Sequence, residues 1–259
     1  MGTFSIEPKA AQTDETTVRD ETDEITVRDT EPPAAEIFAV RVEEAKPIFS
    51  SILIGCFVAI FLCELYVGID KSVIAAGLVK PFVREGQLWR LVTSATMHGG
   101  LLHIYLNSQA LFNIGGAIEA LSNRAHVAVC FLLAAIGGSV ASLILMPETN
   151  SIGASGGIVG LFGFLGVFGF VHKEHLPPGF LRNIFINLAL IVAVGVIGYG
   201  FIDNAAHAGG LLTGIIYGLI FARNSARQEI SNLGNLVGFA SLIAILLAAS
   251  FAVWQMLIF

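Results

Sequence analysis

Charged residues are scarce in this sequence. Only 13% of its 259 residues are Asp, Glu, Lys or Arg, whereas a soluble domain carries about 25%. Hydrophobic residues make up 55% of the chain and the mean hydropathy is +0.77, so an ordinary water-soluble protein is excluded. Basic residues number 14 against 20 acidic ones and form no patch, which excludes nucleic-acid binding as the main activity.

Cysteine is also rare. The three cysteines, Cys56, Cys63 and Cys130, all lie in apolar runs, so a disulfide framework is not expected. His98 and His103 are five residues apart and do not form the His-Glu-x-x-His pattern of a helical zinc site. The sequence therefore predicts neither a metal nor another cofactor.

The few charges that are present gather at one end of the chain. Residues 1–46 carry 12 acidic and 5 basic side chains, a net charge of −7, and repeat one pattern at 14–20 and 23–29. Such a segment has too few apolar groups to offset the entropy of ordering. We expect 1–46 to be a disordered acidic tail on the cytoplasmic side.

From Pro47 onward the chain is a series of apolar runs about 20 residues long, the length that crosses a bilayer as a helix. The pattern predicts an all-α, multi-pass membrane protein. The seven expected spans are roughly 48–68, 98–121, 126–146, 152–171, 183–202, 205–222 and 235–258.

The basic residues between the spans predict an orientation. Seven of them flank the first span or lie in loops on the same side of the membrane. The opposite side has four, Lys71, Lys80, Arg84 and Arg90, all in one long loop. Because basic residues favour the cytoplasm, we expect a cytoplasmic N-terminus in the cell membrane. The second, fourth and sixth spans then all run inward from the outer face.

Polar residues within these three spans lie at one depth. At about 1.5 Å per residue, Ser155 lies about 26 Å, His207 about 24 Å and Asn107 about 26 Å above the inner ends of their helices. His103 lies one turn above Asn107. A serine, a histidine and an amide thus share one layer near the outer surface, and polar groups in a bilayer are candidates for function.

These residue types suit acyl transfer. A serine becomes a nucleophile when a neighbouring histidine takes its proton. A helix N-terminus beside Ser155, with small neighbours Gly153 and Gly156, offers free N–H groups to an oxyanion. His103 and Asn107 are four residues apart and share one helix face. His98 is rotated by about 140° from His103, so we expect it to anchor the preceding loop instead.

Glycines recur every third residue in the fourth span and every fourth in the sixth, as Gly157, Gly160, Gly163, Gly166 and Gly169 and as Gly210, Gly214 and Gly218. Small residues let helices approach closely in lipid, so we expect these two stripes to face each other. Asp203 precedes His207 by four residues, but it lies in a turn. We interpret it as a solvated turn residue and not as part of a triad.

Two classes of function fit the residues alone equally well, a membrane hydrolase and a transporter that uses histidines as a proton relay. Transporters often show an internal repeat, and none relates 47–150 to 151–259.

Several motifs resemble those of the rhomboid family of intramembrane serine proteases. Gly153–Gly156 (Gly-Ala-Ser-Gly) is similar to the family's nucleophile motif, and Ala206–Gly214 to its Ala-His-x-x-Gly-x-x-x-Gly motif. His98–Asn107 matches His-x-x-x-x-His-x-x-x-Asn. Trp89–Arg90 resembles a first-loop pair, and Glu119 falls where the family has a Glu in the second span.

The resemblance implies a six-helix core at 47–225, followed by a linker and a seventh transmembrane helix at 226–259. It implies an endopeptidase that cleaves transmembrane protein substrates within the lipid bilayer, near their outer ends, through a Ser155–His207 dyad. His103 and Asn107 would hold the oxyanion. A binder of membrane helices that does not cut them would share this fold, and the oligomeric state stays open. Residues implied as structural near the site are His98, Trp89, Arg90, Glu119, Gly153, Gly156, Gly210 and Gly214.

Overall fold

The computed structural model describes residues 46–198, 202–225 and 232–259. Almost all of the expected acidic tail, 1–46, therefore lies outside the described residues, as does most of the expected linker. The described residues are mainly helical, with one isolated antiparallel β-bridge between Leu78 and Ser151. The long helices are α2 (Ile48–Val67), α6 (Leu101–Leu121), α7 (Arg124–Leu145), α8 (Ser155–Val171), α9 (Phe180–Ile197), α10 (Asn204–Ser225) and α11 (Asn232–Ile258).

These seven helices coincide with the seven apolar runs. Five of them, α2, α7, α9, α10 and α11, are long and apolar enough to cross a membrane. Helix α8 is apolar but has 17 residues. Helix α6 has 21 residues and falls outside the group of five because polar side chains interrupt its apolar sequence.

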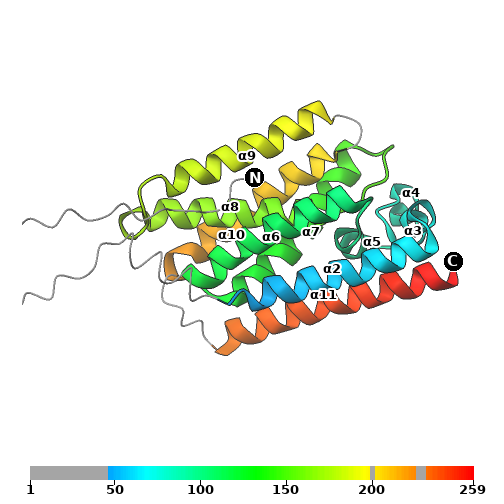
Figure 1. The fold of residues 1–259 in the computed structure, drawn as a ribbon, viewed down its shortest axis with the longest axis horizontal. Coiled ribbons are helices and arrows are strands. Elements are labelled where there is room, and N and C mark those ends of the chain that lie inside the picture. The colour runs from blue at the N-terminus through cyan, green and yellow to red at the C-terminus, as the bar shows by residue number, and fades with distance from the viewer. Residues whose placement is uncertain (1–45, 199–201, 226–231) are drawn as a thin grey trace, which may run out of the picture.

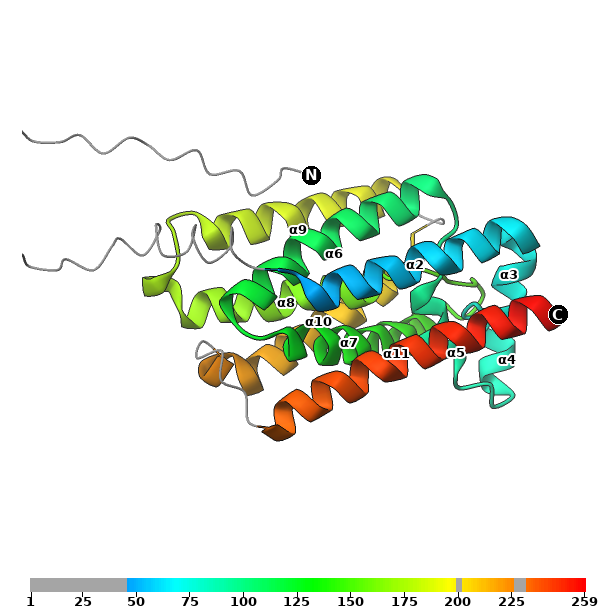
Figure 2. The same cartoon turned by 60° about the horizontal axis from the view of Figure 1, so that its bottom comes forward.

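The helices form one bundle with α8 inside it. Helix α8 packs against α6, α7, α9 and α10, and its contacts with α10 are the most extensive in the fold. Helix α9 lies at one edge and α11 at the opposite edge in both views (Figures 1 and 2), and α11 packs along α7 and α2. Much of α9 therefore presents its side chains outward, and few of them are buried.

The predicted close packing of α8 and α10 is confirmed. A Cβ added to Gly210 would overlap the carbonyl oxygen of Gly156, and one added to Gly214 would overlap that of Gly160. The two backbones are therefore in direct contact, which only glycine permits at these positions.

The stripe on α8 does not lie on one face, so that part of the expectation is wrong. Gly157 lies against Phe131 of α7, Gly163 against the Leu211 carbonyl of α10, and Gly169 against Phe180 of α9. Three residues of an α-helix span about 300°, so a repeat of three winds around the axis by about 60° at each step. The glycines of α8 thus allow close contact with three neighbouring helices, α7, α10 and α9.

The segment between α2 and α6, expected as one long loop, is folded. It contains α3 (Ile69–Ala76), α4 (Lys80–Arg84), α5 (Arg90–Thr93) and a 3₁₀ turn η1 (Ser94–Thr96). These elements gather at one end of the bundle, near the C-terminus (Figure 1). They begin at Gly68, whose φ of 103° lies in the left-handed region that glycine tolerates.

Candidate active site

Ser155 is the first residue of α8, and a fixed loop leads into it. The loop is held by two bonds between Leu78 and Ser151, with N···O distances of 2.9 and 3.3 Å. The Gly153 N–H donates to the carbonyl of Ser94 at 2.9 Å. Gly153 itself has a φ of 133°, a conformation that other residues rarely adopt. The backbone therefore turns sharply just before Ser155 and leaves its N–H unpaired by the helix.

One cavity of about 980 Å³ brings together the four residues expected in the site. Ser155 and His207 line it from the first turns of α8 and α10, and His103 and Asn107 line it from one face of α6. Apolar side chains of α6, α8 and α9 make up much of the remaining wall. Three separate helices thus place a hydroxyl, two imidazoles and an amide around one space.

The hydrogen bonds of His103 define its tautomer. The backbone N–H of Gly99 donates to His103 Nδ1 at 3.4 Å, so Nδ1 is an acceptor and Nε2 carries the proton. His103 Nε2 faces the loop before Ser155, because a Cβ on Gly153 would lie 2.8 Å from it. His103 therefore presents an N–H donor beside the serine, and Gly153 leaves room for its ring.

Asn107 offers a second donor. Its side chain is buried, and its Nδ2 has no hydrogen-bond partner among the described residues. A buried amide without a partner is costly, and such a group is a candidate for binding a substrate oxygen.

His207 lies in the first turn of α10, and its backbone N–H donates to the carbonyl of Asp203 at 3.1 Å. Asp203 is not simply a solvated turn residue, and that interpretation is wrong. Its Oδ1 accepts the N–H of Ala206 at 2.8 Å, and its Oδ2 accepts the hydroxyl of Ser142. Both oxygens are thus engaged elsewhere, which agrees with leaving Asp203 out of a triad.

His98 lies closer to the site than its spacing predicted. Its backbone N–H donates to both oxygens of Glu64 at 3.1 Å, which anchors the end of the loop. Its buried ring packs edge-on against His103, with centroids 5.2 Å apart. The rotation of 140° assumed a helix from residue 98, but α6 begins at Leu101. The expected separation of the two rings is therefore wrong.

Trp89 and Arg90, the first-loop pair, do not line the cavity that contains Ser155. The guanidinium of Arg90 donates to the carbonyl of Gly77 at 2.7 Å and lies 4.5 Å from the ring centre of Trp89. Trp89 in turn packs on Phe251 of α11. Burial lowers the pKa of Arg90 to about 10. Through Gly77, the pair therefore stabilises the segment to which the loop before Ser155 is bonded.

Glu119 lies at the other end of α6 from the site. Its carboxylate accepts the N–H groups of Phe49 and Ser50 at 3.1 and 2.9 Å, and the Ser50 hydroxyl at 2.7 Å. About 18 Å of helix separates it from Asn107. Glu119 therefore caps the start of α2 and is not close to the cavity.

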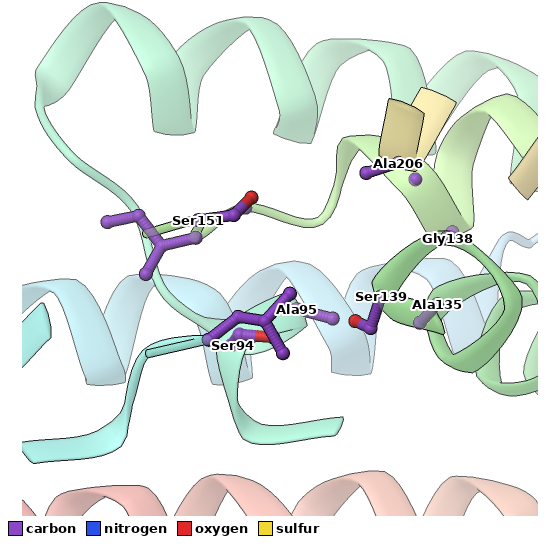
Figure 3. Close-up of a pocket in the computed structure, with 12 residues that line it drawn as sticks. Ser94, Ala95, Ala135, Gly138, Ser139, Ser151 and Ala206 are labelled. Carbon is purple, nitrogen blue, oxygen red and sulfur yellow. The ribbon is translucent and has the colours of Figure 1, made fainter. Parts of the chain in front are cut away.

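A second, much smaller cavity lies behind the serine loop. Its volume is about 20 Å³, enough for one water molecule. Figure 3 shows Ser94, Ser139 and Ser151 around it, and Gly153 and Gly156 line it from the side of Ser155. Sequence reasoning did not find Ser94 or Ser139, because a serine in an apolar run gives no signal of its own.

Comparison with known families identifies this architecture. The profile described as Rhomboid domain matches residues 85–224, which is more than half of the chain. The chain belongs to the rhomboid family. Rhomboid domains are helical and polytopic, so this is a multi-pass integral membrane protein, as the composition predicted.

Individual rhomboid relatives give the same result. The chain is 33% identical over 184 residues to the rhomboid protease GluP of Bacillus subtilis, covering 68% of this chain and 35% of GluP. It is 32% identical over 145 residues to the mitochondrial RHOMBOID-like protein 6 of Arabidopsis thaliana, covering 54% and 46%. The putative rhomboid protease YdcA of Bacillus subtilis is 27% identical over 147 residues, covering 56% and 73%. The chain thus spans less than half the length of the first two relatives.

Proposed function

We propose that the protein is an intramembrane serine endopeptidase that cleaves transmembrane segments near their outer ends through a Ser155–His207 dyad. The observation that carries this proposal is the shared cavity. Ser155, His207 and the unpaired amide of Asn107 line one space, although they come from three helices. Relatives named as rhomboid proteases support the same reaction.

In the proposed reaction, Ser155 Oγ attacks the carbonyl carbon of the scissile peptide while His207 takes the hydroxyl proton. The carbonyl oxygen becomes an oxyanion, which accepts hydrogen bonds from the Ser155 N–H, His103 Nε2–H and Asn107 Nδ2–H. His207 then gives its proton to the departing amine, and the C–N bond breaks. Water hydrolyses the acyl-enzyme by the same steps, with His207 as base, and regenerates Ser155.

The substrate class follows from the surroundings of the cavity. Its walls are mostly apolar side chains of α6, α8 and α9, which suits a helix that leaves the lipid and unwinds near its end. The cavity lies at the end of the bundle that carries α3–α5. With the N-terminus in the cytoplasm, that end faces the outside of the cell membrane.

The test of this proposal is labelling of the purified full chain, in detergent, with a serine-directed fluorophosphonate. We expect the wild type to be labelled and Ser155→Ala not to be, because only a serine beside a base reacts with this probe. Ser250→Ala is the matched control, because Ser250 is exposed on α11 and donates to the Leu246 carbonyl. No labelling of the wild type, as for a transporter or a non-cleaving helix binder, would refute the proposal.

Asn107→Ala should slow cleavage without abolishing it. Loss of one oxyanion donor typically lowers kcat about 10²–10³-fold, and two donors remain. The change should leave KM nearly constant, because the oxyanion forms only in the transition state. Steady-state kinetics on a transmembrane substrate measures both constants. Gln109→Ala is a control on the same helix, because Gln109 carries an amide but does not line the cavity. Unchanged kinetics in Asn107→Ala would remove Asn107 from the site.

A further inference from the structure

A hydrogen-bonded chain of three side chains joins the folded loop to the helix of His207. Lys80, at the start of α4, donates from Nζ to the Ser142 hydroxyl of α7 at 2.7 Å, across 62 residues of sequence. Ser142 donates in turn to Asp203 Oδ2, 61 residues further on. Lys80 and Ser142 are completely buried.

Each hydrogen bond between these three side chains has a defined donor and acceptor. An ammonium group can only donate, so Ser142 accepts from Lys80 and has a single hydrogen left to give. That hydrogen goes to Asp203, whose other oxygen accepts the N–H of Ala206. The chain therefore runs from a buried cation through a hydroxyl to an anion at the first turn of α10.

The same short segment also holds the serine. Leu78, two residues before Lys80, is bonded to Ser151, four residues before Ser155. Lys80 reaches Asp203, four residues before His207, through Ser142. One segment, residues 78–80, is thus the common anchor of the loop that carries the nucleophile and of the helix that carries the base.

Close helix packing makes this connection possible. Gly138 lies one turn before Ser142 on α7, and a Cβ there would lie 2.7 Å from the Ala206 carbonyl. The first turn of α10 therefore rests on the backbone of α7, within reach of Ser142. No aromatic ring packs on His207 in the ranges that the structure describes. The position of His207 consequently depends on the start of α10.

We propose that Lys80, Ser142 and Asp203 are positioning residues that fix His207 relative to Ser155. The three residues do not touch the reacting atoms. They hold the start of α10 to the segment that also anchors the serine loop. Ser155 and His207 are thus positioned relative to the same segment, residues 78–80. This inference rests on the proposed function, because its effect is measured through the reactivity of Ser155.

The experiment is a double-mutant cycle on the full chain. Lys80→Met leaves the Asp203 carboxylate without its cation, and Asp203→Asn leaves the buried ammonium of Lys80 without its anion. We expect each single variant to lower kcat and the fluorophosphonate labelling rate by about 10- to 100-fold. KM should change little, since the substrate-binding walls are untouched. Because both residues hold the same connection, the double variant should be no slower than the slower single variant, a coupling that independent sites do not show.

Two further variants separate positioning from general stability. Lys71→Met is the matched control, because Lys71 is an exposed lysine of α3 in the same loop, and it should behave as wild type. Ser142→Ala tests the bridge without removing a charge and should lower kcat with KM retained. Thermal unfolding is measured for every variant, so that a loss of kcat can be compared with a loss of fold.

The positioning role of Lys80, Ser142 and Asp203 is refuted if the wild type and the single variants are labelled at equal rates. It is also refuted if the double variant is as slow as the product of the two single losses. A kcat that falls only in proportion to the fraction unfolded would likewise reduce the three residues to a structural role. If the wild type is not labelled at all, the proposed function is refuted, and the positioning role that rests on it is refuted as well.

Discussion

Ser155→Ala and His207→Ala should each abolish cleavage of a transmembrane substrate that carries a helix-destabilising segment near its outer end. The nucleophile and its base act as one unit, and loss of either typically lowers kcat about 10⁶-fold. For the same reason the double variant should be no slower than either single variant. Expression and thermal stability should stay near those of the wild type, because both side chains line a cavity and do not pack within the core.

Cleavage is measured with purified variants at matched concentration, by the appearance of the product fragment. His175→Ala is the control for the histidine, because His175 is exposed in the turn after α8, at the other end of that helix from Ser155. Near-wild-type turnover in either Ser155→Ala or His207→Ala would show that the dyad is assigned wrongly. Additive losses in the double variant would show that the two residues do not act in one step.

The long helices could be predicted because each lies in an apolar run, and five of them are long and apolar enough on their own composition to cross a membrane. A run of about 20 apolar residues satisfies its backbone internally and needs no partner to be recognised. The folded loop between α2 and α6 could not be predicted in this way. Its helices are four to eight residues long, and they depend on contacts made across the fold, such as that of Lys80 with the Ser142 hydroxyl of α7.

The candidate site was likewise predictable where it depends on residues within the long helices. Counting residues from the helix ends gave Ser155, His207 and Asn107 a common depth, and they line one cavity. The roles of Lys80, Ser142 and Asp203 were not visible, because more than 60 residues separate each bonded pair. His98 was misplaced because sequence periodicity does not show where a helix begins. Hydrogen bonds between side chains that are distant in the sequence thus could not be predicted from helix length and periodicity.

The glycines between α8 and α10 connect packing to chemistry. Gly214 touches the carbonyl of Gly160, and Gly210 touches that of Gly156, one residue after Ser155. The two helix backbones are therefore in direct contact at these positions, with no room for a Cβ between them. In the proposed dyad, Ser155 and His207 must come within about 3 Å to share a proton. Any side chain inserted at this contact would separate the two helices.

Gly214→Leu and Gly160→Leu should therefore lower kcat and fluorophosphonate labelling at least about 100-fold, since an error of about 1 Å at a reacting centre costs that much. Gly55→Leu is the matched glycine control, because a Cβ at Gly55 of α2 meets nothing within 4 Å. Ala244→Leu, at an exposed position of α11, controls for added bulk. Activity and labelling are compared for all four variants at matched expression. Full activity in Gly214→Leu and Gly160→Leu would mean that the helices can separate without moving His207 from Ser155, and close packing would then not govern the catalytic distance.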